Sequence, residues 1–305
     1  MRITYVNLWG GFSESNHQDE CFLTDIIREI HPTCEVSLGY EKGTHYDLVF
    51  SMYRPIPTTK YFLDTKECEH KSVCFTGESY DIVETTPNCD AYIGFDLEEL
   101  HQGKNYEYLR FPLYAVYHMM SLKKYGCNTF QELREKFKKT PTIPKFSAVV
   151  SNPNNSLRTS VIQKLISIGL CDSGGRTLNN VAMNMDDKIS FCSNYPINIA
   201  FENLPKKHYI TEKIYEAYVS GSVPFYWGAD DISEEFNPNS FILFDTNNTE
   251  STNNSIHKAI SLLTNSEELN KMRDVDPTTN YRSDKYLSHG KEILKNFIMN
   301  VLETS

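Results

Sequence analysis

The chain has 305 residues, of which 40% are hydrophobic, with 19 tyrosines and 17 phenylalanines; this composition indicates a well-packed globular protein larger than one small core. Its formal net charge of −10 argues against nucleic acid as a partner, because a polyanion binds to a basic surface. No apolar run approaches the ~20 residues of a membrane-spanning helix, and the N-terminus has no signal-peptide pattern, so a cytoplasmic protein without a transmembrane segment is expected.

The first half of the chain alternates short apolar runs with helical patterns. Strands are predicted at residues 2–9, 47–53, 72–77 and 90–95. Helical periodicity marks residues 22–30, and residues 130–140 have the pattern of a charged amphipathic helix. Two prolines within residues 140–145 make this segment the best candidate for a linker between domains.

The same alternation starts again after the linker. Strands are predicted at residues 145–152, 197–203, 222–228 and 241–245, with helices at 157–169 and 211–220. The polar residues 247–254 are predicted to form a loop, and residues 291–303 an amphipathic helix. Strands that alternate with helices favour a parallel sheet covered on both faces. The predicted fold class is therefore α/β, with two Rossmann-like domains facing across a cleft.

The eight cysteines indicate neither a zinc site nor a redox motif. They contain no C-x-x-C pair and no zinc-ligand spacing. Free, mostly buried thiols are favoured over disulfides, although an even number permits pairing. The residues concerned are Cys21, Cys34, Cys68, Cys74, Cys89, Cys127, Cys171 and Cys192.

Chemically unusual loops follow three of the predicted strands, at the edge where parallel sheets bind ligands. They are TGES (76–79), SNPNNSLR (151–158) and FENLPKKHYITEK (201–213). In the last two, Arg158 and Lys213 fall in the first turn of the following helix, and Thr211 is the expected N-cap. A cation is unfavourable beside the positive end of a helix dipole unless an anion binds there. A diphosphate would suit two such helix starts; the alternative is that both residues are ordinary solvated charges.

These segments resemble the α-1,3-fucosyltransferases, which use GDP-fucose. FEN followed by YITEKIYEAYVSGSVPFYWG is similar to the donor-binding signature of that family. SNPNNSLR resembles the loop that carries its phosphate-binding arginine, and FTGE, followed by DAYIGFD and YLRFPLY, resembles the segment with its proposed catalytic carboxylate. With gaps, the likeness extends from about residue 72 to residue 245.

The resemblance implies a role for each matched residue. Glu78 would be the catalytic base, and the donor-binding residues would be Asn152, Arg158, Asn203, Tyr209, Glu212 and Lys213. Arg158 and Lys213 would hold the pyrophosphate, whereas Glu212 and Tyr209 would contact sugar or nucleoside hydroxyls and the base. For these last two, a favourable acid in a first helical turn and a core tyrosine are the structural alternatives.

The implied activity is an inverting transfer of L-fucose from GDP-fucose to an acceptor hydroxyl, expected to be O3 of N-acetylglucosamine in an oligosaccharide. The implied fold is of the GT-B glycosyltransferase type, with an acceptor-binding domain at residues 1–142, a GDP-fucose-binding domain at 143–283 and a C-terminal helix at 284–305. Two alternatives stay open: the same site used for another nucleotide sugar, and a nucleotide- or carbohydrate-binding protein without catalysis. Peripheral contact with a membrane is also left open.

No metal and no cofactor is expected. The DVD sequence at residues 274–276 resembles a D-x-D metal site but follows no predicted strand, so a surface loop is favoured. Asp230 and Asp231 are interpreted as helix-capping residues, and His208 as a solvated or core imidazole. Because Arg158 and Lys213 supply the charge that a metal supplies in other glycosyltransferases, transfer is expected to be metal-independent.

Overall fold

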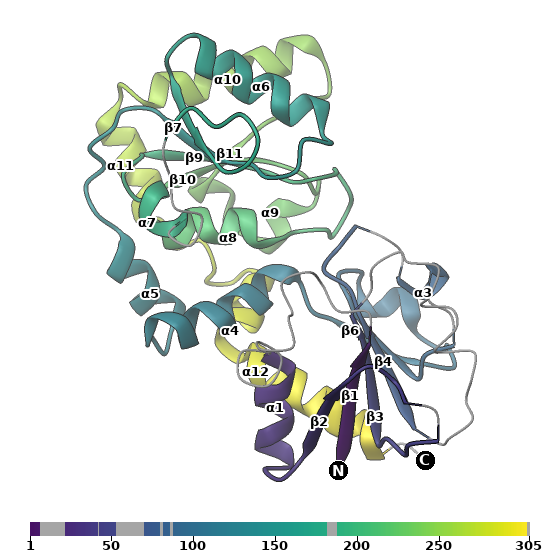
Figure 1. The fold of residues 1–305 in the computed structure, drawn as a ribbon. Helices are drawn as coiled ribbons and strands as arrows, with labels where there is room; N and C mark the ends of the chain where they lie inside the picture. Colours follow the sequence, from purple (N-terminus) through teal and green to yellow (C-terminus); the bar gives the residue numbers. More distant parts are fainter. Residues whose placement is uncertain are drawn as a thin grey trace. The chain divides into compact units, whose positions relative to one another are not determined.

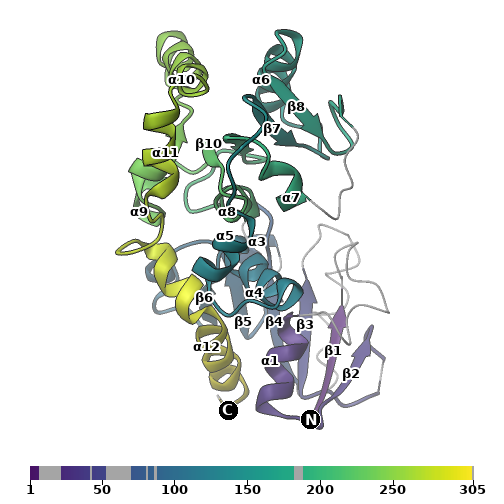
Figure 2. The same cartoon turned by 90° about the vertical axis from the view of Figure 1, so that its left-hand side faces the viewer.

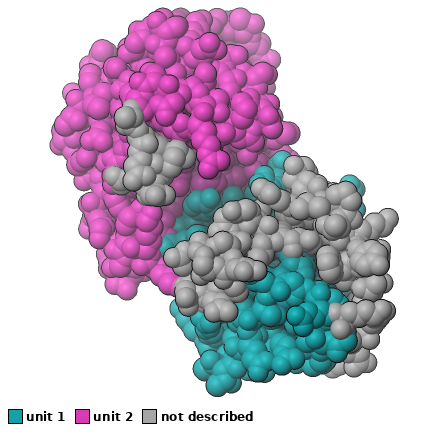
Figure 3. Space-filling view, in the orientation of Figure 1, with its two compact units in different colours: residues 1–120, 289–305 teal, residues 121–288 magenta. Residues whose placement is uncertain are grey.

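The computed structural model describes residues 1–6, 22–41, 43–52, 70–79, 82–85, 88–181 and 188–303. The chain divides into two compact units, residues 1–120 with 289–305 and residues 121–288, which are coloured separately in Figure 3. These divisions differ from the sequence-based boundaries at 142/143 and 283/284. The acceptor- and donor-binding roles assigned to the two domains stay predictions.

The first unit is built on a six-stranded sheet in the order β2-β1-β3-β4-β5-β6, with all neighbouring strands parallel. The strands are β1 (Arg2–Val6), β2 (Glu35–Leu38), β3 (Leu48–Met52), β4 (Lys71–Phe75), β5 (Ala91–Gly94) and β6 (Glu107–Arg110). Its helices are α1 (Phe22–Ile30), α3 (Ile82–Thr85), η1 (Glu98–His101), the start of α4 (Leu113–Tyr125) and the end of α12 (Arg282–Glu303).

Helices cover both faces of this sheet (Figures 1 and 2). On one face, α1 packs its buried residues onto the strands: the Tyr5 hydroxyl lies 2.8 Å from the Thr24 hydroxyl. On the other face, Ile82 of α3 packs against Cys74 and Tyr92. Coverage of both faces explains why β4 and β5 are buried along almost their whole length rather than at alternate residues.

The second unit contains a five-stranded sheet in the order β11-β10-β9-β7-β8, again with parallel neighbours. Its strands are β7 (Phe146–Val149), β8 (Cys171–Gly174), β9 (Ile197–Phe201), β10 (Val223–Trp227) and β11 (Ile242–Leu243). Its helices are α5 (Phe130–Phe137), α6 (Ser156–Ser167), α7 (Lys188–Cys192), α8 (Glu212–Val219), α9 (Ile232–Glu235), η3 (Pro238–Ser240), α10 (Thr249–Leu262) and α11 (Ser266–Asp274).

The two faces of the second sheet are covered by different helices (Figures 1 and 2). Ile197, Ile199 and Phe201 of β9 point into a core that α6, α10 and α11 complete. The intervening Asn198 points to the other face, where its amide donates to the Cys192 sulfur of α7 at 3.1 Å. This alternation is the side-chain period of a strand, and it places α7 and α8 on the face opposite α6.

The predicted α/β class with parallel sheets in both units is confirmed. The bounds predicted for α1 match the structure, and most other predicted elements agree within a few residues. Residues 7–9 and 53 of two predicted strands lie outside the described residues.

Two predicted features in the last third of the chain are wrong. Residues 247–254 are not a loop, because α10 begins at Thr249, where Asn248 and Ser251 form a reciprocal capping box. The last helix begins at Arg282, nine residues before the amphipathic pattern predicted at 291–303 and two before the C-terminal helix assigned to 284–305. Polar residues hide the start of α10, since its cap is itself polar.

The state of the cysteines and the hydropathy of the helices agree with the expectations from the sequence. Six cysteines among the described residues are free: Cys34, Cys74, Cys89, Cys127, Cys171 and Cys192. Cys21 and Cys68 lie outside the described residues. Within the part of the chain that the structure describes, no helix combines the length and the hydropathy needed to span a bilayer.

Candidate functional site

Two loops meet at the carboxyl ends of β7 and β9 in the second unit. The first precedes α6, whose N-cap Asn155 accepts a hydrogen bond from the backbone N–H of Arg158 at 2.8 Å. The Asn155 side chain also donates to the Asn203 carbonyl at 2.9 Å and so joins the first loop to the second. The arginine predicted in the first turn of a helix is therefore in that position, with its loop fixed to the loop after β9.

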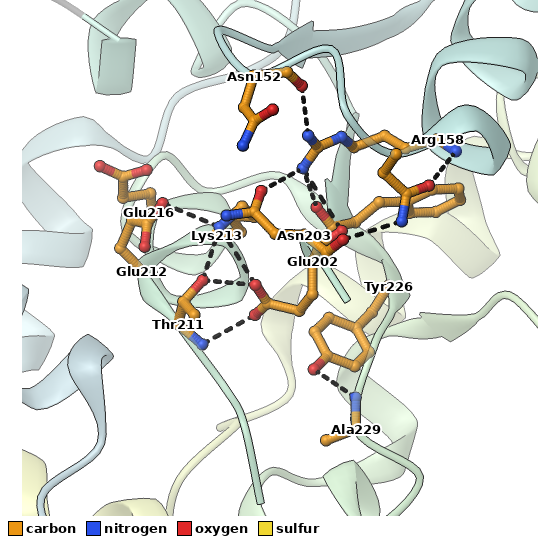
Figure 4. Close-up of polar contacts among 12 residues, drawn as sticks. Asn152, Arg158, Glu202, Asn203, Thr211, Glu212, Lys213, Glu216, Tyr226 and Ala229 are labelled. Carbon is orange, nitrogen blue, oxygen red and sulfur yellow. Dashed lines mark hydrogen bonds and ion pairs between the residues drawn. The ribbon is translucent and has the colours of Figure 1, made fainter. Parts of the chain in front are cut away.

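Arg158 is buried, with 4% of its surface exposed. Figure 4 shows its guanidinium directed at the Asn203 side-chain oxygen, 2.7 Å from Nη1, and at the Asn152 carbonyl, 2.6 Å from Nη2. Nε has no hydrogen-bond partner among the described residues. Burial lowers the pKa of the guanidinium, and the negative charges of Glu202 and Glu212 partly offset this. Arg158 is thus a desolvated cation held by neutral oxygens, not a solvated surface charge.

Lys213 approaches the same region from the first turn of α8. Its Nζ lies 3.2 Å from Glu202 Oε2 and 3.2 Å from Glu212 Oε1, and it donates to the Thr211 hydroxyl at 2.9 Å (Figure 4). Burial lowers the pKa of Lys213, but the two carboxylates outweigh burial, so the net shift is upward. The ammonium therefore stays charged throughout the neutral range.

Glu202 is a site residue that the sequence analysis missed. It is fully buried, and its carboxylate accepts from the Thr211 N–H at 2.8 Å and from the Thr211 hydroxyl at 2.6 Å. Thr211 occupies the N-cap position of α8, as predicted, but its hydroxyl binds Glu202 and makes no cap hydrogen bond. A buried carboxylate is costly without a counter-charge, which Lys213 provides. The signal in the sequence was an acid directly after the apolar strand INIAF.

Gly228 completes the packing around Glu202. A Cβ atom at this position would lie 2.5 Å from Glu202 Cγ and 2.6 Å from the Tyr226 hydroxyl. The Tyr226 hydroxyl itself accepts from the Ala229 N–H at 3.1 Å (Figure 4). The glycine after β10 is therefore required by close approach of side chains.

The cations converge on a pocket of about 20 Å³. Its apolar walls come from β7 and β9, and its polar lining includes three cations from three helices. The lining residues are Val149, Val150, Arg158, Lys188, Asn198, Ile199, Phe201 and Lys213. A small, cation-lined pocket at the carboxyl ends of parallel strands suits an anion.

The remaining predicted donor-binding residues contribute in different ways. Asn152 contacts Arg158 through its carbonyl, while its side-chain oxygen accepts from the Asn154 N–H at 2.9 Å. Glu212 pairs with Lys213. Burial alone would raise the pKa of Glu212, but the charges of Lys213 and Lys188 outweigh burial and lower this pKa to about 2. Tyr209 is buried, with 2% exposed, and its proposed contact with the nucleoside stays a prediction.

Glu78 lies in the first unit, in the turn that follows β4. Its backbone N–H donates to the Thr76 hydroxyl at 3.1 Å, and the residue is half-buried. The local structure thus places it after a strand, as the sequence predicted. Its role as a base stays a prediction.

The carboxylates of the DVD sequence are engaged in local structure. Asp274 forms an ion pair with Lys138 at 2.6 Å, and Asp276 accepts from the N–H and hydroxyl of Thr278 at 2.8 and 2.9 Å. Among the residues that the structure describes, no group of three or more His, Cys, Asp or Glu side chains is arranged to hold a metal ion. Metal independence itself stays a prediction.

Asp231 and His208 form a buried pair that the sequence did not indicate. The Asp231 carboxylate accepts from the His208 N–H at 2.9 Å and lies 2.5 Å from its Nδ1. Asp231 is at the N-cap position of α9, as predicted, but its side chain makes no cap hydrogen bond. His208 lies in the loop between Asn203 and α8, and the pair fixes that loop to the start of α9.

Comparison with known proteins identifies relatives of this site and fold. Residues 125–271 match the C-terminal region of glycosyltransferase family 10 (fucosyltransferase). An α-(1,3)-fucosyltransferase of Helicobacter pylori is 29% identical over 272 residues, which cover 79% of this chain and 53% of that protein. This chain therefore spans about half the length of that curated relative.

Solved structures extend the likeness over the whole chain. A crystal structure of an α1,3-fucosyltransferase with GDP-fucose superposes with a TM-score of 0.72 and 25% identity, covering 100% of this chain and 90% of that one. A DNA-modifying β-glucosyltransferase shares the fold alone, with a TM-score of 0.50 and 12% identity. The GT-B-type fold predicted from the sequence is confirmed, and so is the predicted resemblance to the α-1,3-fucosyltransferases.

Proposed function

We propose that this chain is a member of the α-1,3-fucosyltransferase family and transfers L-fucose from GDP-fucose to a hydroxyl of an oligosaccharide acceptor. The observation that carries the proposal is the convergence of Arg158 and Lys213 on one pocket, from two helix starts at the ends of β7 and β9. The relative whose structure holds GDP-fucose has the same fold over nearly its whole length. An anionic donor is what this arrangement of cations suits.

The cations act mainly on the leaving group. As the bond between fucose and GDP breaks, negative charge develops on the diphosphate. A buried guanidinium and a fixed ammonium stabilise that charge more in the transition state than in the bound donor, because burial weakens screening by water. Glu202 and Glu212 hold Lys213 in place, so little reorganisation is needed when charge develops.

The acceptor step requires a base. In a single inverting displacement, a carboxylate takes the proton from the attacking hydroxyl while fucose leaves GDP. We assign this role to Glu78, on the resemblance of FTGE to the family segment with its proposed catalytic carboxylate. The acceptor hydroxyl is proposed to be O3 of N-acetylglucosamine.

Titration calorimetry with GDP, GDP-fucose and GDP-mannose tests the donor. We expect GDP and GDP-fucose to bind, and turnover with GDP-fucose alone. Arg158→Ala and Lys213→Ala should each lower kcat/KM by about 10²–10³. Lys271→Ala, which removes an exposed lysine paired with Glu267, should leave it unchanged. An absence of GDP binding would overturn the proposal. Binding without turnover would instead support a binding protein without catalysis, and turnover of GDP-mannose would support an enzyme that uses another nucleotide sugar.

Transfer is proposed to need no divalent metal. Arg158 and Lys213 supply fixed positive charge at the diphosphate, so activity in excess EDTA should match that of the untreated enzyme within about twofold. Initial rates with and without EDTA, followed by Mn²⁺ addition, provide the measurement. Complete loss in EDTA with recovery on Mn²⁺ would contradict metal independence without affecting donor identity.

A further inference from the structure

Lys188 is a third cation at the pocket, and neither the sequence motifs nor the family signature assigns it a role. It begins α7 and forms an ion pair with Glu216 of α8. Its side chain is 22% exposed, and that of Glu216 is 14% exposed. A lysine this desolvated loses much of its contact with water, so its position needs an explanation beyond a surface charge.

The pocket gives Lys188 access to the same ligand as Arg158 and Lys213. All three line it, each from a different helix, next to Asn198 and the apolar residues of β7 and β9. Lys188 also influences the neighbouring carboxylate, because its charge, after that of Lys213, helps to lower the pKa of Glu212 to about 2 against the opposing effect of burial. The three cations therefore share one electrostatic environment.

The balance of charge around the pocket depends on Lys188. Arg158, Lys188 and Lys213 face Glu202, Glu212 and Glu216, so cations and carboxylates are equal in number. Burial raises the pKa of Glu216, and Lys188 opposes that shift. Without Lys188 the cluster would carry an excess of one negative charge wherever Glu216 stays ionised. Such an excess would repel the diphosphate of a nucleotide sugar, which carries two negative charges of its own.

We propose that Lys188 is a donor-binding residue that contacts the diphosphate directly. This inference rests on the proposed function, since it adds a residue to the same site. On donor binding, the ammonium keeps Glu216 as one partner and donates another of its three N–H groups to a phosphate oxygen. Glu216 therefore acts as a positioning residue, which holds the Lys188 ammonium toward the pocket.

Calorimetry with GDP and with inorganic pyrophosphate tests this role. Lys188→Met removes the charge and keeps the apolar part of the side chain. We expect it to lower the affinity for both ligands by about 10–100-fold, the range of one charge-assisted hydrogen bond. Lys188→Arg should stay within several-fold of the native protein. The matched control is Lys145→Met, since Lys145 is also paired with a carboxylate, Asp172, but does not line the pocket; its affinities should not change.

A double variant separates direct contact from charge balance. Lys188→Met with Glu216→Gln restores equal numbers of cations and carboxylates, so direct contact predicts that GDP binding stays weak, whereas recovery to native affinity would overturn the proposal. Native affinity in Lys188→Met alone would do the same. If a Met variant unfolds, the loss of affinity is read from Lys188→Gln instead. Failure of the native protein to bind GDP while it binds pyrophosphate would instead contradict the proposed function.

Discussion

Gly228 shows how one backbone position sets the geometry of the charged cluster. Because a Cβ there would meet Glu202 and Tyr226 at 2.5 and 2.6 Å, Gly228→Ala forces these buried side chains to move. We expect a loss of about 1–3 kcal/mol in the free energy of unfolding and a severalfold weaker GDP affinity, measured by urea unfolding and calorimetry.

A second glycine provides the control for Gly228→Ala. Gly290 lies inside α12, where an added Cβ would come no closer than 3.5 Å to the Phe111 ring. Gly290→Ala should therefore raise stability by about 0.5–1 kcal/mol, because alanine favours helix. If Gly228→Ala were as stable as the native protein, close packing around Glu202 would not be the reason for the glycine.

Glu212 should make stability depend on pH. Although burial raises its pKa, Lys213 and Lys188 lower it to about 2 from the usual 4.5. Because the folded pKa is below the unfolded one, the stabilisation is complete above about pH 4.5 and is lost as the pH falls toward 2. At pH 7, Glu212→Gln should cost on the order of 1–3 kcal/mol.

Urea unfolding of the native protein and Glu212→Gln at pH 7, 5, 4 and 3 measures this dependence. The difference between them should be constant at the two higher pH values and should shrink at the lower two. Glu267→Gln, at an exposed residue paired with Lys271, should differ little from the native protein throughout. A Glu212→Gln difference independent of pH would show that its carboxylate does not titrate in this window.

At the scale of single residues, the sequence indicated Arg158 and Lys213 but missed three of the charged residues around them. Both cations stood out because they occupy helix starts, which is a local feature. Lys188 and Glu216 meet only when α7 and α8 pack side by side, and no local pattern reports that contact. Glu202 is the middle residue of the FEN motif, yet only its complete burial shows that it must have a counter-charge.

At the scale of the elements, we expect the loop between β9 and α8 to position Asn203 and Tyr209, two of the proposed donor-binding residues. His208 fixes it by donating its N–H to Asp231 at 2.9 Å, and it does so with a φ of +64°, a left-handed conformation that favours Asn or Gly over alanine. His208→Ala removes the ring contact and adds backbone strain. We expect a loss of about 2–3 kcal/mol in stability and a higher Kd for GDP.

Two further variants separate the causes. His208→Asn tolerates the left-handed backbone but loses the full reach of the imidazole, so its stability should fall between those of the native protein and His208→Ala. His257→Ala, on the exposed face of α10, should behave as the native protein. Unchanged GDP affinity in a folded His208→Ala would mean that the pair does not position the donor loop.

Prediction of the elements succeeded where apolar periodicity is strong and failed where polar caps or short strands carry the structure. The helix at residues 22–30 was predicted with its bounds because its apolar face is continuous. The short strands β2, β6 and β8 were missed; β8 has the sequence CDSG, which has no strand pattern although all four residues are buried. Tertiary packing determines such a strand, not its own propensity.

For the whole molecule, the parallel α/β architecture followed from the alternation of strands and helices, but the membership of its units did not. Residues 289–305 belong with residues 1–120. In that unit, Lys291 of α12 forms an ion pair with Glu29 of α1. The hydrophobic periodicity of a helix does not report a contact between residues this far apart in the sequence. The sequence analysis therefore assigned the C-terminal helix to a segment of its own.

The division into two units makes the assignment of the base testable. All the donor-binding residues proposed here lie in residues 121–288, whereas Glu78 lies in the other unit. Removing the Glu78 carboxylate should therefore leave GDP binding intact while it removes the proton acceptor. Glu78→Gln keeps the shape and the backbone hydrogen bond to Thr76, so we expect kcat to fall by about 10²–10⁴ with the Kd for GDP unchanged.

Single-turnover kinetics and calorimetry on the same preparation measure both quantities, and Glu84→Gln is the matched control, because Glu84 is an exposed carboxylate of α3 in the same unit. It should retain native kcat. More than about a tenth of native turnover in Glu78→Gln would be too much for an enzyme deprived of its base, and Asp96, which follows β5, would become the next carboxylate to test. A fall in GDP affinity together with kcat would instead mean that Glu78 supports the donor site.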